Sequence, residues 1–172
     1  MGASLLMMVA SLPKTRSGSD DDKTALAASA NTLIGLQQQL TEAIDTDSAA
    51  YDAVVAAYRM PKASEPEQAA RKAAIQRALR SATDVPLGVM RLSVLAMREA
   101  AAVAAHGHRA AASDVGVAVA LLAAGARGAR LNVEINVGSL TDGSYVEAVK
   151  AETDRLAAEA SQLGDAAQAS LG

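Results

Sequence analysis

The stretch LIGLQQQLTEAIDTDSAAYDAVVAAY, residues 33–58, decides the fold of this chain. One mostly apolar line runs along it in steps of three and four residues, which is the spacing of a single face of an α-helix. The members of this line are Leu33, Gln37, Leu40, Ile44, Asp47, Tyr51, Val54 and Tyr58. The pattern therefore predicts one long helix from about Asp21 to Arg59, ended by Pro61.

The composition points to helices in the rest of the chain as well. Hydrophobic residues make up 51% of the 172 residues, whereas aromatic residues make up only 2%. Alanine supplies much of the apolar count and is the strongest helix former, so helices are favoured over strands. We expect an all-α fold, with residues 1–172 forming one antiparallel bundle of about five helices. The expected helices are 2–12, 21–59, 64–105 with a kink or interruption at Pro86, 114–137 and 145–169.

The expected fourth helix has two features that bear on its place in the bundle. Residues 115–126 carry no charge, so we expect this helix to be central, with Ser113 and Asp114 as its cap. Gly125 and Gly128 lie on one face of it and have no side chains. The backbone of another helix can therefore approach closely there.

The chain lacks the signals of several other classes of protein. It has no cysteine, which excludes disulfides and thiolate chemistry and leads us to expect a cytoplasmic protein. Its net charge is -3 and it has no basic patch with interleaved aromatics, so we expect no nucleic-acid partner. The longest apolar runs fall short of the roughly 20 residues that cross a membrane, so we expect no membrane partner. His106 and His108 have no acidic ligand at metal spacing, so no metal site is expected.

Asp47 occupies a position where the apolar line calls for a hydrophobic side chain. Asp45 lies about 200° away around the same helix, so only Asp47 belongs to the line. A carboxylate on an apolar seam costs free energy unless it is paired or hydrated. We expect it to be partly buried, and two interpretations follow. The pattern alone favours a structural bond to a neighbouring helix; the alternative is an acid or base that transfers protons near neutral pH.

Three other polar residues are candidates for binding a ligand. Asn132 and Asn136 lie one turn apart on the apolar fourth helix, where they either bind the polar edge of a flat heterocycle or hydrogen-bond to another helix. Lys62 follows the helix that bears Asp47 and is either an anion-binding group or a solvated lysine at a helix end. Residue pattern alone favours the structural interpretation for each.

Four fragments of the sequence carry a family resemblance in matching order and spacing. They are DTDSAAYDAVVAAYRMPK (45–62), ATDVPL (82–87), ASDVGVA (112–118) and LNVEINV (131–137), the last followed by LTD (140–142). The chain resembles the formiminotetrahydrofolate cyclodeaminase and methenyltetrahydrofolate cyclohydrolase family over almost its whole length. The resemblance implies an all-helical bundle, usually a homodimer, that acts on the one-carbon bridge of tetrahydrofolate without a metal or redox cofactor.

The resemblance also implies roles for five residues. It places the family's catalytic aspartate at Asp47, which would move a proton at the one-carbon bridge. Lys62 would steady Asp47 as an anion or meet a carboxylate of the folate's glutamate tail. Asp114, Asn132 and Asn136 would orient the pterin or the attacking water.

The chain departs from the family at its start and leaves alternatives open. Family members usually begin with a Gly-Gly-Gly-Ser loop that is missing here, so we expect the domain to be truncated at its N-terminus. Besides an active enzyme, the sequence allows a non-catalytic helical homo-oligomer or folate-binding relative. It also allows an accessory subunit that supplies a helical surface to a larger enzyme.

Overall fold

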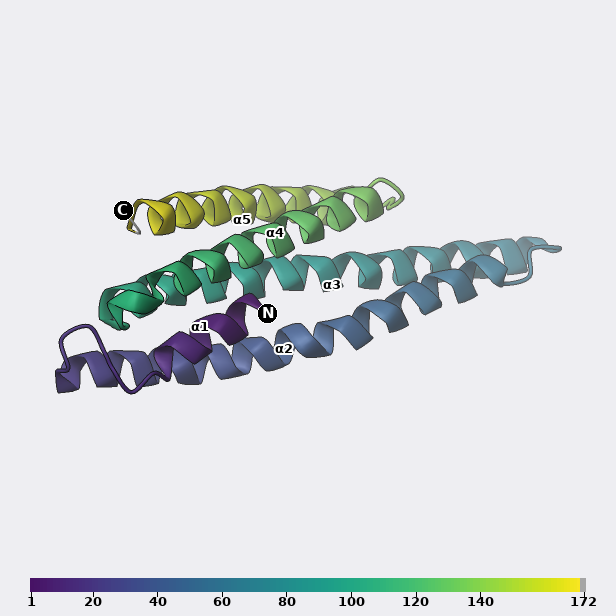
Figure 1. Cartoon of the computed structure of the whole chain (residues 1–172). Coiled ribbons are helices and arrows are strands. Elements are labelled where there is room, and N and C mark those ends of the chain that lie inside the picture. The colour runs from purple at the N-terminus through teal and green to yellow at the C-terminus, as the bar shows by residue number, and fades with distance from the viewer. Residues whose placement is uncertain (171–172) are drawn as a thin grey trace.

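A computed structural model describes residues 1–170 and contains five α-helices and one short 3-10 helix within them (Figure 1). The elements are α1 (Gly2–Ala10), α2 (Asp20–Arg59), α3 (Glu65–His106), η1 (Arg109–Ala111), α4 (Ala112–Val137) and α5 (Gly143–Ser170). The only β-type pairing in this part of the chain is an isolated bridge between Thr15 and Gly107. The all-α bundle predicted from the sequence is confirmed.

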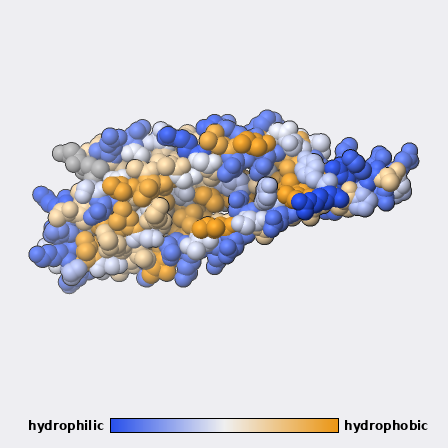
Figure 2. All heavy atoms as spheres, turned by 45° about the vertical axis from the view of Figure 1, so that its right-hand side comes forward, coloured by the Kyte–Doolittle hydropathy of each residue, from blue (hydrophilic) through white to orange (hydrophobic). Residues whose placement is uncertain are grey.

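The two longest helices form an antiparallel hairpin that fixes the length of the molecule. Ser19 caps α2 by accepting a hydrogen bond from Asp22, and Ser64 with Glu67 forms a capping box at the start of α3. Arg71 donates from α3 to the carbonyl of Tyr58 on α2 at 3.0 Å, close to the turn. The tapering end formed by this hairpin is mostly hydrophilic, whereas the broader part carries several apolar patches (Figure 2).

The central helix is α3, because it packs against α1, α2, α4 and α5. The sequence-based prediction that the fourth helix is central was wrong. One face of α4 is buried, but the opposite face is exposed in the single chain. The low charge of α4 therefore reflects a second apolar face rather than a central position. The predicted cap is also wrong, since η1 leads directly into α4 and no side chain caps its first turn.

Pro86 lies inside α3 without interrupting it. A proline has no N–H, so the carbonyl of Ala82, four residues earlier, loses its helical partner. The side chain of Asn136 on α4 donates a hydrogen bond to this carbonyl at 2.8 Å. A neighbouring helix thus supplies the donor that Pro86 lacks, and α3 continues as one helix past residue 86.

The segment Arg109–Val137 is long and apolar enough to cross a membrane, which differs from the sequence-based expectation that no segment is. Length and composition alone are weak support for a span, because core helices of soluble proteins have the same properties. In the bundle, α4 packs against α1, α3 and α5 along one side.

Candidate functional site

The line of residues that contains Asp47 becomes more exposed toward the C-terminal end of α2. Leu33 is fully buried, Leu40 is half-buried and Asp47 is exposed. A spacing of seven residues keeps all three on nearly the same side of the helix. The short helix α1 packs beside the N-terminal half of α2 and does not extend as far as Asp47 (Figure 1). The predicted partial burial of Asp47 is therefore wrong for the single chain. Its side chain has no hydrogen bond or ion pair among residues 1–170.

Asp47 and Asn136 stand at about the same level along the bundle. Arg71 of α3 contacts Tyr58 of α2 across the hairpin. Asp47 lies eleven residues from Tyr58 on α2, and Ala82 lies eleven residues from Arg71 on α3. Both are therefore about 16 Å from this contact along the helices. Ala82 in turn accepts the hydrogen bond from Asn136 on α4. Asp47 and Asn136 thus flank α3 from two different helices at one level.

The two asparagines differ in their surroundings. Asn136 is half-buried, and its amide nitrogen is already bonded to the carbonyl that Pro86 leaves open, as the structural interpretation of this residue predicts. Asn132 is exposed and its side chain has no hydrogen-bond partner in the described chain. Of the two, only Asn132 has a side-chain amide with both hydrogen-bonding ends available to a ligand.

Asp114 lies at the opposite end of α4 from both asparagines. The helix is continuous between them, so eighteen residues separate Asp114 from Asn132 by about 27 Å. Asp114 is half-buried in the first turn of α4. A single chain therefore does not bring Asp114 to the site that Asp47 and Asn136 flank.

Lys62 is also too far from Asp47 to touch it. The helix α2 continues to Arg59, which is about 18 Å from Asp47 along the axis, and Lys62 follows beyond the helix end. The lysine side chain cannot span that distance, so it cannot steady the Asp47 carboxylate within one chain. This geometry leaves two of the predicted interpretations of Lys62, which are contact with a carboxylate of the folate's glutamate tail and a solvated lysine at the helix end.

Lys62 belongs to a basic groove of about 400 Å³ beside the α2–α3 turn. The groove is lined by Lys62, Gln68, Arg71, Lys72, Ile75 and Gln76. The three cations have no carboxylate partner among residues 1–170, while Arg71 also lies over the ring of Tyr58 at 5.6 Å. Sequence reasoning missed Arg71 and Lys72. The signal available was the pair of adjacent cations that follows the capping box after Lys62.

The strongest electrostatic perturbations lie outside this site. A hydrogen bond with His106, followed by those from the backbone and hydroxyl of Ser17, holds the pKa of Asp22 well below its ordinary value. Burial, followed by a hydrogen bond to Asp84, raises the pKa of Tyr145 above its ordinary value. The first network ties the α1–α2 loop to the end of α3, and the second ties α5 to α3, so both are structural.

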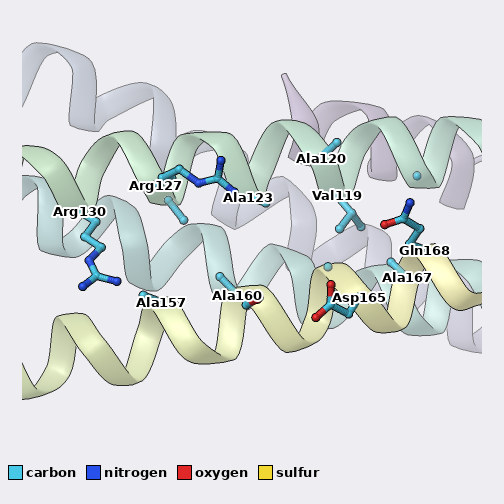
Figure 3. Close-up of a pocket in the computed structure, with 14 residues that line it drawn as sticks. Val119, Ala120, Ala123, Arg127, Arg130, Ala157, Ala160, Asp165, Ala167 and Gln168 are labelled. Carbon is cyan, nitrogen blue, oxygen red and sulfur yellow. The ribbon is translucent and has the colours of Figure 1, made fainter.

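A cavity of about 590 Å³ lies between α4 and α5 and contains none of the predicted site residues (Figure 3). Small side chains such as Ala123 and Ala160 form its walls, with Arg127 and Asp165 on opposite helices. Among residues 1–170, no three histidine or carboxylate side chains gather at a position that would hold a metal ion.

Comparison with known proteins places the chain in a family. Residues 1–155 match the family described as formiminotransferase-cyclodeaminase. A methenyltetrahydrofolate cyclohydrolase from Methylorubrum extorquens is 39% identical over 165 residues, which cover 96% of this chain and 79% of that protein. This chain belongs to that family. The resemblance inferred from the four sequence fragments is thereby confirmed.

Two further comparisons concern a longer protein and a solved structure. The formimidoyltransferase-cyclodeaminase of Sus scrofa is 33% identical over 122 residues, which cover 71% of this chain but only 23% of that longer protein. The crystal structure of a formiminotetrahydrofolate cyclodeaminase from Thermotoga maritima superposes with a TM-score of 0.87 at 24% identity. That match covers 99% of this chain and 81% of the other, and it shows that the two share a fold.

Proposed function

We propose that this chain is a one-carbon folate enzyme, a methenyltetrahydrofolate cyclohydrolase or a formiminotetrahydrofolate cyclodeaminase. The observation that carries the proposal is the 39% identity to a methenyltetrahydrofolate cyclohydrolase over nearly the whole chain. The geometry supports it, because Asp47 of the matching fragment presents an uncommitted carboxylate at the level of Asn136.

Asp47 would carry the proton transfer in either reaction. In the hydrolytic direction, water adds to the bridging carbon of methenyltetrahydrofolate while the Asp47 carboxylate takes its proton, and opening of the ring leaves formyltetrahydrofolate. In the deaminating direction, the aminobenzoyl nitrogen attacks the formimino carbon, and protonation of the formimino nitrogen by Asp47 lets it leave as ammonia. Both schemes use only the substrate, water and a side-chain carboxylate, so the proposal needs no resident cofactor.

The order of residues along α2, from Asp47 to the basic groove, matches the order of groups along a folate. The one-carbon bridge, the aminobenzoyl ring and the glutamate follow one another in the ligand. On α2, Asp47, the exposed ring of Tyr51 and the Tyr58–Arg71 contact follow one another on the same side of the helix. With the bridge at Asp47, the glutamate carboxylates would extend toward Lys62 and Arg71.

The chain is also proposed to act as a homodimer formed through the exposed face of α4. Leu131 and Ile135 are more than half exposed on this face, and an apolar helix face left open by a single chain marks an interaction surface. Asn132 lies at its edge, so the substrate would bind close to the dimer interface.

Turnover of the purified chain tests the proposal. Loss of the ultraviolet absorption band of methenyltetrahydrofolate reports hydrolysis, and its appearance together with ammonia from formiminotetrahydrofolate reports cyclodeamination. The proposal predicts at least one of these reactions above the buffer rate. If a folded sample shows neither reaction, the chain is the non-catalytic relative that the sequence also allows.

A further inference from the structure

The exposed face of α4 is an apolar stripe directly opposite the buried face of the same helix. The buried residues are Val115, Ala118, Val119, Leu122, Ala126, Ala129, Val133 and Val137. On the other side, Val117 is 52%, Leu121 40%, Leu131 56% and Ile135 73% exposed. Nothing lies within 4 Å of a side chain added at Gly128, which stands in the middle of the stripe. We call residues 117, 121, 124, 128, 131 and 135 the α4 stripe.

The residues of the α4 stripe are arranged almost symmetrically about residue 126. Three pairs of similar residues lie at equal distances on either side of this midpoint. They are Val117 with Ile135, Leu121 with Leu131, and Ala124 with Gly128. Two copies of α4 packed antiparallel about this point would place bulky residues against bulky residues at the ends. In the middle, small residues would meet and let the backbones approach. This self-complementarity is what an isologous two-fold contact requires.

Electrostatics also favour a second copy of this chain over another partner. None of the six positions of the α4 stripe carries a charge, and Arg130 is drawn aside by ion pairs with Glu134 and with Asp154 on α5. Antiparallel packing sets the positive N-terminal end of one α4 beside the negative C-terminal end of the other. A second copy of α4 is therefore complementary to the α4 stripe both in shape and in electrostatics.

This packing has a consequence for the site, and it rests on the proposed function. Positions 114 and 138 are equally far from the midpoint, so the partner's Asp114 would lie at the level of residue 138. Residue 138 is two residues beyond Asn136, which is a distance of about 3 Å along the helix axis. Asp114 and Asn132 lie on the same edge of α4, and the two-fold keeps that edge on one side of the pair. We propose that Asp114 of the partner subunit completes each substrate site beside Asn132 and Asn136, which Asp114 of the same chain cannot reach.

Cross-linking tests the register of the two helices without any activity. The chain has no cysteine, so Val117→Cys and Ile135→Cys each introduce a single thiol. We expect a short thiol-reactive cross-linker to join the two variants when they are mixed. Each variant alone should stay unlinked, since its two thiols would be about 27 Å apart. A mixture without cross-linked dimer, or efficient linking of either variant alone, overturns the proposed packing.

Mixing two inactive variants tests the shared site. Asp114→Asn and Asn132→Ala should each lose most activity as homodimers. After subunits exchange, half of the dimers are mixed, and each has one intact site, so about a quarter of the wild-type rate should return. If both variants are dimeric and the mixture gains nothing, or if either variant keeps the full rate, the shared site is wrong. If the wild type itself is inactive, the proposed function fails, and the cross-linking result still decides the packing.

Discussion

Asn136 shows how one residue can hold a helix together across an interface. Its amide donates to the carbonyl of Ala82, whose usual partner is missing because residue 86 is a proline. We expect Asn136→Ala to lower the free energy of unfolding by about 1–3 kcal/mol, because it leaves a carbonyl unpaired inside the bundle. In a Pro86→Ala background the same change should cost less, since the N–H of residue 86 then bonds to Ala82.

A double-mutant cycle by urea denaturation measures this coupling. Asn132→Ala, one turn away and exposed, is the matched control and should change stability little. Equal costs of Asn136→Ala with and without Pro86 would show that the hydrogen bond does not serve the proline.

Asp22 makes the stability of the fold depend on pH. Its pKa is lowered by hydrogen bonds from His106 and Ser17, so it binds a proton less readily in the folded chain than in the unfolded one. A lowered pKa stabilises the fold above the unfolded value of about 3.9 and loses that contribution as the pH falls below it. We expect stability to drop more steeply between about pH 5 and pH 3 in the wild type than in Asp22→Asn.

Asp20→Asn is the control for this comparison, because Asp20 belongs to the same helix turn but its carboxylate is almost fully exposed. Thermal unfolding followed by circular dichroism at a series of pH values gives the slopes. Equal slopes for the wild type and Asp22→Asn would contradict the role assigned to Asp22.

At the scale of single residues, the sequence located Asp47 but did not predict its exposure. Its place on the helix follows from spacing within α2. Whether the position is covered depends on where α1 ends in space, and spacing along one helix carries no such information. The same limit explains Asp114, which sequence order groups with Asn132 and Asn136 although α4 holds them about 27 Å apart.

At the scale of elements, the turn between α2 and α3 is the part with a testable function of its own. If Lys62 binds the glutamate end of the substrate, Lys62→Gln should raise KM about tenfold and leave kcat nearly unchanged, because the contact is equal in ground and transition states. The neighbouring Arg71→Gln should act in the same way.

Steady-state kinetics with the folate substrate measures both constants. Lys150→Gln is the control, since Lys150 is exposed on α5 and pairs only with Glu147. A fall in kcat with Lys62→Gln at unchanged KM would instead show that Lys62 acts in the reaction at Asp47 and not in binding the glutamate.

The order and approximate bounds of the helices were predictable because periodicity, caps and prolines are local signals. Those signals place α2 within a residue of its observed start and end α2 before Pro61. They failed to predict that α3 continues as one helix past Pro86, where the compensating donor comes from α4, and they failed for the central helix, where absence of charge does not distinguish a buried face from an exposed apolar face. Both failures concern contacts between helices distant in sequence.

At the scale of the whole molecule, we expect two chains rather than one. Leu121→Glu places a charge in the α4 stripe and should convert the dimer to a monomer, because an unpaired charge is costly to bury. Leu95→Glu is a close control, since Leu95 is also 40% exposed but lies on α3 outside the stripe. Sedimentation equilibrium distinguishes the two outcomes. A Leu121→Glu variant that stays dimeric would place the interface elsewhere.

The catalytic role proposed for Asp47 is tested most directly by comparing the turnover rate of Asp47→Asn with that of Asp45→Asn. Both changes remove one charge from exposed positions of α2, two residues apart and on different sides of the helix. If Asp47 moves the proton at the one-carbon bridge, Asp47→Asn should lower kcat by at least about 100-fold while Asp45→Asn stays close to the wild type. A full rate for Asp47→Asn, in a chain whose wild type turns over methenyltetrahydrofolate, would show that Asp47 does not carry the proton transfer.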